Sequence, residues 1–203
     1  MIEAAVAALR GGETVVLPFD TVYGLATEPS SDESARRLYR LKGREQEQPT
    51  ALVAATLDEL LERIPELRGR TASLAARLLP GPLTLVVPNP ARRFPWVTGG
   101  SPEAIGIRVP DIAGPGADVL AQVGVVIATS ANAPGERDPR RIDDVPARIR
   151  DGAGAVVDGG ELPGTPSTVI DLTAAEPRVL REGALAADEA LARLATAVRS
   201  STA

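Results

Sequence analysis

Short apolar runs of four to six residues recur along this chain and alternate with stretches of helical periodicity. Such runs are typical of buried strands, and most of them end at a proline or at a group of small polar residues. The clearest runs cover residues 14–17, 51–55, 83–87, 104–109 and 125–128, and further strands are expected near 155–157, 167–172 and 178–180. Helical spacing or an N-terminal capping pattern marks residues 2–10, 32–41, 56–63, 71–79, 118–123, 143–150 and 188–199. Interleaved strands and helices without a dividing linker predict one domain over residues 1–203, with helices packed on a single mixed sheet.

Four segments between these elements carry the polar and turn-forming residues that predict loops. They are residues 19–27, 43–49, 89–102 and 129–139. The third segment, rich in proline, glycine and arginine, is expected to be an exposed excursion. Sheets with helices packed on them usually bind ligands on the loops that follow their strands, so we expect the functional site among these loops.

The chain contains no histidine and no cysteine. Their absence excludes zinc fingers, disulfide frameworks, cysteine nucleophiles and imidazole general bases. The 22 basic and 27 acidic side chains give a net charge of −5, which argues against sequence-independent binding of nucleic acid. No apolar stretch reaches the roughly 18 to 20 residues of a membrane span, so we expect a soluble, cytoplasmic protein.

Polar clusters follow several of the predicted strands. They are residues 18–25 (PFDTVYGL) with Lys42 and Arg44 further on, Arg108 within an apolar strand, residues 129–132 (TSAN), and residues 166–171 (PSTVID) with Arg181 after them. Taken singly, each cluster also has a plain structural interpretation, such as a turn, a helix C-terminus with its cations or an arginine on an edge strand. Together, cations and hydroxyl groups without a nucleophile or a base suit an anionic ligand such as a nucleotide or a carboxylate.

Alternation along the fourth cluster places Ser167, Val169 and Asp171 on one face of a strand, and Thr168 and Ile170 on the other. A merely structural strand would show the same pattern. The chain contains neither a Walker motif nor a dinucleotide fingerprint.

Seven short motifs occur in one order from about Gly11 to Gly183. They read PFDTVYGLA, KGR, PGPLT, IRVP, TSAN, PSTVID and LREG. Each motif is weak alone, but their shared order and spacing strongly resemble the YrdC family of threonylcarbamoyl-AMP synthases. The resemblance implies an α+β fold with a twisted mixed sheet, flanking helices and a concave ligand cleft. It implies the short, single-domain form, without the additional C-terminal domain of longer relatives.

The resemblance also implies a nucleotidyltransferase reaction. L-Threonine and bicarbonate form a carbamate, which attacks the α-phosphate of ATP to give threonylcarbamoyl-AMP and pyrophosphate. ATP is then a substrate with Mg²⁺ as the expected metal ion, and downstream proteins transfer the threonylcarbamoyl group to a tRNA adenosine. The acidic charge of the chain makes direct tRNA binding the less favoured part of this picture. Phosphoryl-type transfer needs positioning and charge neutralisation rather than imidazole, which fits the lack of histidine.

The matching motifs imply roles for eight residues. Lys42 and Arg44 are expected to meet the nucleotide phosphates and to stabilise charge in the transition state. Thr21 and Arg108 are expected to contact L-threonine, Arg108 through the carboxylate. Ser167 is expected to contact the threonine or the adenylate. Three further residues are expected to contact ATP, namely Ser130, Asn132 and Arg181. No residue is assigned to a metal ion.

Two positions depart from the family pattern. Phe19 stands where threonine is common, which would narrow or dry the cleft, and Val53 stands near the position of a histidine in many longer relatives. Two other functions stay open at this point. One is a non-catalytic RNA-binding module of the same fold, and the other is an enzyme that forms a different acyl- or carbamoyl-adenylate.

Overall fold

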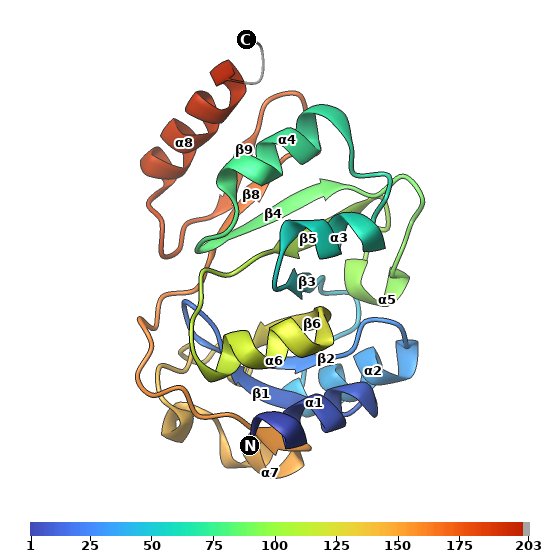
Figure 1. Ribbon diagram of the computed structural model, residues 1–203, viewed down its shortest axis with the longest axis vertical. Coiled ribbons are helices and arrows are strands. Elements are labelled where there is room, and N and C mark those ends of the chain that lie inside the picture. Colours follow the sequence, from blue (N-terminus) through green and yellow to red (C-terminus); the bar gives the residue numbers. More distant parts are fainter. Residues whose placement is uncertain (201–203) are drawn as a thin grey trace.

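A computed structural model describes residues 1–200 of the chain, with one nine-stranded sheet and helices packed on it (Figure 1). The strands are β1 (Val15–Pro18), β2 (Tyr23–Thr27), β3 (Ala51–Ala54), β4 (Leu83–Pro88), β5 (Ala104–Arg108), β6 (Val125–Ser130), β7 (Ala155–Val156), β8 (Thr168–Asp171) and β9 (Arg178–Arg181). The helices are α1 (Ile2–Arg10), α2 (Asp32–Lys42), α3 (Leu57–Arg63), α4 (Gly69–Leu78), α5 (Pro95–Thr98), α6 (Pro115–Val123), α7 (Ala147–Gly152) and α8 (Ala187–Ser200), with a 3₁₀ turn at Ile142–Asp144. No helix within residues 1–200 is long and apolar enough to cross a membrane.

The strand order across the sheet is β7-β1-β2-β6-β3-β5-β4-β8-β9. Three neighbouring pairs are parallel, namely β1 with β7, β3 with β5, and β4 with β8. The other neighbouring pairs are antiparallel. The mixed sheet with flanking helices that the sequence predicts is therefore confirmed.

The sheet is covered on both faces at its β7-β1-β2 end. Helices α1 and α6 pack against Val15 and Leu17 on one face of β1. Helices α2 and α7 pack against Val16 on the other face of β1, together with Leu25 of β2. A strand that is buried on both faces needs the continuous apolar run that residues 15–17 provide.

Around β4 and β5 the core lies on one face only, against α3, α4 and α8 (Figure 1). The alternation of β4 follows from this arrangement. Leu83, Leu85 and Val87 are buried in the core, whereas Thr84 and Val86 are partly exposed on the opposite face. That open face carries the site described below.

The structure corrects the prediction that residues 19–27 form a loop. Only the first part is a turn, and Tyr23–Thr27 form β2, which is fully buried and paired with β1 and β6. Within β2, Gly24 makes room for a neighbouring side chain. A Cβ at Gly24 would lie 2.4 Å from Cε2 of Phe19, so the glycine lets the Phe19 ring pack against the strand.

Several other boundaries also differ from the prediction, and two of them have a clear physical reason. Thr129 and Ser130, predicted as loop, continue β6, because they pair with β2. The helix predicted at 143–150 is divided into the 3₁₀ turn and α7, with Pro146 at the N-cap of α7. Proline has no N–H to donate within a helix and is tolerated only at its start.

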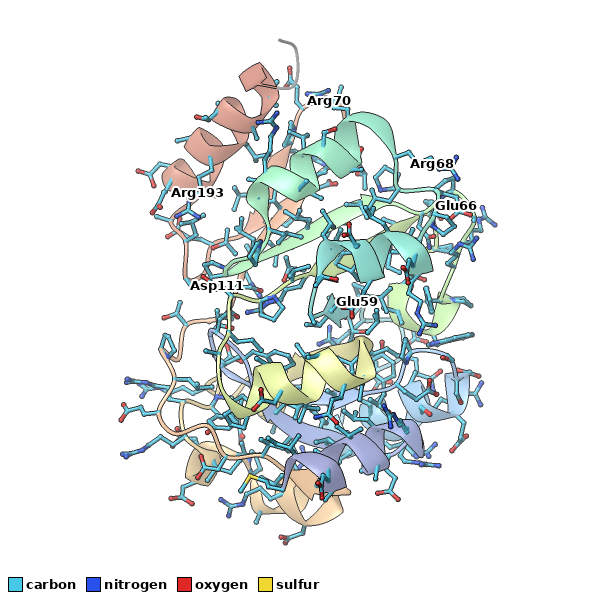
Figure 2. The ribbon with its side chains drawn as sticks, in the orientation of Figure 1. Glu59, Glu66, Arg68, Arg70, Asp111 and Arg193 are labelled. Atoms are coloured by element: carbon cyan, nitrogen blue, oxygen red, sulfur yellow. The ribbon has the colours of Figure 1, made fainter. Side chains whose placement is uncertain are left out.

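The segment 89–102, predicted as an exposed excursion, packs back onto the protein. Asn89 is fully buried and donates to the carbonyl groups of Arg93 and Pro102 at 2.9 Å. Arg93 forms a two-bond ion pair with Glu66, which projects from the loop between α3 and α4 (Figure 2). The excursion is therefore a packed element, in which α5 buries Val97.

This segment also supports the loop that carries Arg44. Thr50 N donates to Val97 O (2.9 Å), and Gly100 N donates to Glu47 O (3.1 Å). At Gly99, which has φ +57°, a Cβ would lie 2.3 Å from Glu47 O. Glycine at this position allows the two backbones to approach each other.

We expect the Gly99→Ala substitution to destabilise the protein by about 2 kcal/mol or more, because it adds backbone strain and a clash with Glu47. For a chain of this size the melting temperature should fall by about 4–8 °C, measured by thermal unfolding. Gly100→Ala is the matched control, since a Cβ at Gly100 meets no atom within 4 Å. Equal melting temperatures for the two variants would contradict the expectation.

Candidate active site

A cavity of about 570 Å³ lies on the open face of the sheet, within the size range of small-molecule sites. A row of residues paired across five strands forms part of its floor, namely Ala128, Ala51, Gly106, Val86 and Asp171. Three of these five residues are alanine or glycine, so little side-chain bulk stands above the central strands. This cavity corresponds to the concave cleft that the family resemblance implies.

Three arginines reach the cavity from different elements. Arg44 follows α2, Arg108 ends β5 and Arg181 ends β9. Arg44 donates from Nη1 to Thr129 Oγ1 (3.0 Å) and from Nη2 to Pro49 O (2.6 Å). Burial lowers the pKa of Arg44, and the nearby charge of Arg181 lowers it further.

The other two arginines have different kinds of partner. Arg181 donates from Nη2 to Ser167 O (2.7 Å), which is a neutral acceptor. Arg108 forms an ion pair with Asp20 and also donates from Nη2 to Thr21 Oγ1 (2.8 Å). The Nε atoms of Arg108 and Arg44 are buried and have no hydrogen-bond partner. Because three guanidinium groups line this one cavity, it is suited to anions.

Lys42 is the last residue of α2, which ends there because Gly43 takes a left-handed conformation with φ 71°. Its Nζ donates to Ser130 O (2.6 Å) and also contacts Ser130 Oγ and Asn132 Oδ1. Burial, aided by the charge of Arg44, lowers the pKa of Lys42 to about 8. Lys42 therefore ties α2 to the end of β6, and its charge is sensitive to mildly alkaline pH.

Five of the eight predicted site residues line the cavity, and three lie directly behind it. Those that line it are Arg44, Arg108, Ser130, Ser167 and Arg181. Thr21, Lys42 and Asn132 are buried, and each bonds to a residue that lines the cavity. The structure thus brings all eight together, although the sequence does not distinguish the lining residues from the supporting ones.

The alternation predicted for the fourth cluster matches the structure. Ser167, Val169 and Asp171 line the cavity, and Ser167 Oγ lies 2.8 Å from Thr84 Oγ1 on β4. Thr168 faces the other way, where its hydroxyl group bonds to the backbone of Leu185.

Sequence reasoning misses Asp20 as a site residue. Its carboxylate pairs with Arg108, and Oδ2 accepts from Asp111 N (3.2 Å). Burial raises the pKa of Asp20, although the charge of Arg108 opposes that rise. The signal in the sequence is that an arginine within an apolar strand needs a partner, and Asp20 is an acidic residue in another of the polar clusters.

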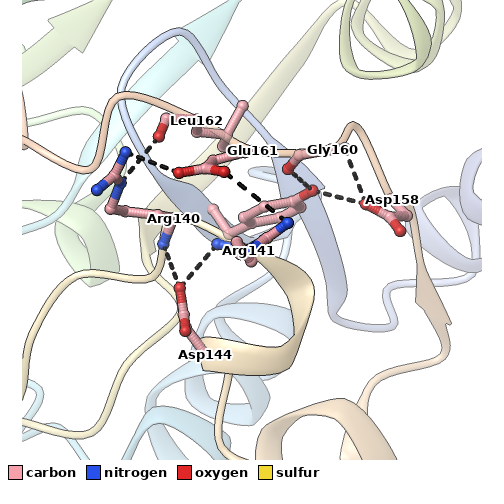
Figure 3. A network of polar contacts seen from close by, with 8 residues as sticks. Arg140, Arg141, Asp144, Asp158, Gly160, Glu161 and Leu162 are labelled. Atoms are coloured by element: carbon pink, nitrogen blue, oxygen red, sulfur yellow. Dashed lines mark hydrogen bonds and ion pairs between the residues drawn. The ribbon is translucent and has the colours of Figure 1, made fainter.

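The segment from β7 to β8 runs past the turn that holds Asp20 and Thr21, and Gly164 N donates to Thr21 O (2.8 Å). Figure 3 shows how this segment is tied down. Tyr23 OH donates to Gly160 O (2.7 Å) and lies 2.9 Å from Asp158 Oδ1. Burial, with a contribution from Asp158, raises the pKa of Tyr23 to about 12, so this hydroxyl group stays protonated.

Arg140 secures the same segment from the opposite side. It bonds to Glu161 Oε1 (2.9 Å) and to Leu162 O (3.2 Å), while Asp144 accepts from the backbone N–H groups of Arg140 and Arg141 (Figure 3). These contacts fix the backbone that supports Thr21 and hence the position of Arg108.

Comparisons with known proteins agree with this geometry. The model of the Sua5, YciO and YrdC family, described as "Telomere recombination", matches residues 7–183. A protein of Stenotrophomonas maltophilia named "Threonylcarbamoyl-AMP synthase" is 36% identical over 165 residues, which are 78% of this chain and 86% of that protein. A protein of the same name from Pyrococcus abyssi is 32% identical over 191 residues. That alignment covers 93% of this chain and 55% of the relative, so the chain spans about half of the relative's length.

The crystal structure of Pyrococcus abyssi Sua5 complexed with L-threonine has a TM-score of 0.85 to this fold at 31% sequence identity. The superposition covers 95% of this chain and 56% of that chain. The family model spans most of the sequence, and the Stenotrophomonas maltophilia protein is matched over most of its length. The chain therefore belongs to the Sua5/YciO/YrdC family.

Proposed function

We propose that this protein is a threonylcarbamoyl-AMP synthase, a nucleotidyltransferase that uses L-threonine, bicarbonate and ATP. The amine of threonine combines with bicarbonate to give a carbamate and water. A carbamate oxygen then attacks the α-phosphorus of ATP, and the bond from that phosphorus to the β-phosphate oxygen breaks. Threonylcarbamoyl-AMP and pyrophosphate are the products, and downstream proteins pass the threonylcarbamoyl group to tRNA.

The observation that carries this proposal is the charge of the cavity. Arg44 and Arg181 have only neutral partners within residues 1–200, and they lie close enough for the charge of one to lower the pKa of the other. Two uncompensated guanidinium groups in one cavity repel each other unless a polyanion lies between them. A triphosphate is such a polyanion. The relatives named threonylcarbamoyl-AMP synthase suggest that it belongs to a nucleotide.

In this reaction Arg44 and Arg181 bind the phosphates and neutralise the charge that develops on the pyrophosphate leaving group. Lys42 adds a third positive charge behind Ser130, and with Asn132 it fixes the Ser130 hydroxyl group. Ser130 is proposed to contact the nucleotide. None of these groups needs to act as a nucleophile, because the carbamate is the attacking group.

Arg108 is proposed to bind the carboxylate of L-threonine, with Thr21 and Ser167 as the other contacts. A guanidinium group is suited to a carboxylate because its donors are planar. The Pyrococcus abyssi Sua5 structure is a complex with L-threonine, which supports an amino acid as a ligand of this fold.

We propose Mg²⁺ as the counterion of the ATP triphosphate. Residues 1–200 contain no group of three or more histidine, cysteine or acidic side chains placed to hold a metal ion. Asp171, the acidic residue that lines the cavity, bonds to Thr173 and Arg178. The residues proposed for catalysis therefore bind and orient the phosphates directly.

The test is to incubate the protein with ATP, L-threonine and bicarbonate and to follow pyrophosphate release, with detection of the adenylate by mass spectrometry. We expect release that depends on all three substrates. No threonine-dependent release, under conditions where the Stenotrophomonas maltophilia protein turns over, would contradict the proposal. Omitting each substrate in turn separates this reaction from the formation of another adenylate, and salt-dependent RNA binding without ATP binding would favour an RNA-binding module.

A further inference from the structure

The three cavity arginines differ in how their charge is balanced. Arg108 and Asp20 form an ion pair in which the side chains are only 11% and 8% exposed. Arg44 and Arg181, in contrast, bond only to hydroxyl and carbonyl oxygens within residues 1–200. The cavity thus combines one neutralised guanidinium group with two uncompensated ones.

The turn after β1 holds Arg108 from three directions. Asp20 and Thr21 both accept from Nη2, and the ring of Phe19 lies 6.0 Å from Cζ. This distance is within the range of a cation–π contact. Both hydrogens of Nη2 are therefore used within the protein, which leaves Nη1 as the donor available to a ligand. Oδ2 of Asp20 accepts from Asp111 N, so the carboxylate is itself fixed.

This cavity would receive two kinds of anion, a polyphosphate and an amino-acid carboxylate, and they differ in charge. Arg44, Arg108 and Arg181 all line this cavity, and the charge of Arg181 lowers the pKa of both other arginines. Without Asp20, all three guanidinium groups of the cavity would be uncompensated positive charges. The attraction of an anion grows with its charge, so a polyphosphate would gain more from such a surface than a single carboxylate would. Polyphosphate would then compete with the amino-acid carboxylate for Arg108.

We propose that Asp20 determines specificity within the cavity: by neutralising Arg108, it reserves that side chain for the amino-acid carboxylate and keeps polyphosphate on Arg44 and Arg181. The assignment of Arg108 to the amino acid rests on the proposed function. Pyrophosphate, the product, should consequently compete with ATP but not with L-threonine in the wild-type enzyme.

The probe is inorganic pyrophosphate, and the variant is Asp20→Asn. By isothermal titration calorimetry we expect pyrophosphate to bind the variant at least tenfold more tightly than the wild type. In steady-state assays, pyrophosphate should become competitive with L-threonine. Unchanged pyrophosphate affinity would overturn the inference. The binding measurement needs no turnover, so it is independent of the proposed function, whose own failure is a wild type that releases no threonine-dependent pyrophosphate.

Asp111→Asn is the matched control, because it removes the same charge close to Asp20 from an exposed side chain. We expect its pyrophosphate affinity to stay within twofold of wild type. An increase equal to that of Asp20→Asn would mean that net charge alone is responsible, which would also overturn the inference. The double variant Asp20→Asn/Arg108→Gln should lose the gained affinity, since it removes the released cation.

Removing one partner of a buried ion pair destabilises a protein strongly, so folding is checked by thermal unfolding. If Asp20→Asn does not fold, Asp20→Ser takes its place, because the smaller side chain admits water to hydrate Arg108. The same tenfold gain in pyrophosphate affinity is expected. Asp20→Glu keeps the charge and should retain the wild-type affinity, and tighter binding of pyrophosphate by Asp20→Glu would contradict the role of charge.

Discussion

Replacing Arg44 with alanine is expected to lower kcat about a hundredfold, the scale of losing one preorganised charge contact in a transition state. Arg44 lines the cavity, has neutral partners and carries a buried Nε without a hydrogen-bond partner. Its charge is therefore available to the phosphates. Threonine-dependent pyrophosphate release, measured at saturating ATP and L-threonine, gives kcat directly.

Arg40→Ala is the control for Arg44→Ala. Arg40 lies near the end of α2 and carries the same charge, but it is exposed and pairs with Glu33 on the protein surface. We expect its kcat to stay within twofold of wild type. Arg44→Lys keeps the charge but loses the planar fork of donors, so an intermediate loss of about tenfold is expected. An Arg44→Ala enzyme that keeps more than a fifth of the wild-type kcat would show that Arg44 does not stabilise the transition state.

Replacing Lys42 with alanine is expected to lower kcat/KM for ATP by about a hundredfold or more at pH 7. The loss has two causes: one positive charge disappears, and Ser130 and Asn132 lose the donor that fixes them. KM for L-threonine should change little, because the hydrogen bonds of Lys42 lead to Ser130 and Asn132, which are proposed to contact the nucleotide. Equal losses for both substrates would contradict a role at the nucleotide.

The pH dependence of the wild type tests the same residue. Burial lowers the pKa of Lys42 to about 8, an effect that Arg44 and Arg148 increase and that Asp138 and Glu136 oppose. Lys42 is charged below this pKa and neutral above it, so kcat/KM for ATP should fall as the pH rises through about 8. The Lys42→Ala enzyme should lack this fall, and its persistence in the variant would assign the titration to another group.

The elements with strong local signals could be predicted from the sequence. The capping box of α3 is present as predicted, with Thr56 and Glu59 bonded to each other's backbone N–H groups. The glycine after Lys42 ends α2. By contrast, β2 carries only a weak local signal, because it contains Gly24 and because, besides its hairpin with β1, it pairs with β6, about a hundred positions along the chain. Tertiary pairing overrides local propensity at such a strand.

The candidate site, like the fold, could be predicted only in part from the sequence. The ordered motifs indicate the eight residues, and the structure gathers all of them around one cavity. Which of them lie behind it depends on contacts such as Lys42 with Asn132, which join distant parts of the chain. Asp20 escapes prediction for the same reason, because its partner Arg108 is far away in the sequence.

The strand order has a consequence for the synthesis of the protein. The cavity needs β2 beside β6 and β8 beside β4, and Arg181 belongs to the last strand of the sheet. At roughly 5–20 residues per second, a ribosome needs roughly 10–35 s to reach Arg181. No shorter nascent chain can hold all three arginines in place, so the full set of cavity cations is present only late in synthesis. The lining of the cavity is complete only after the strand that carries Arg181 has been made.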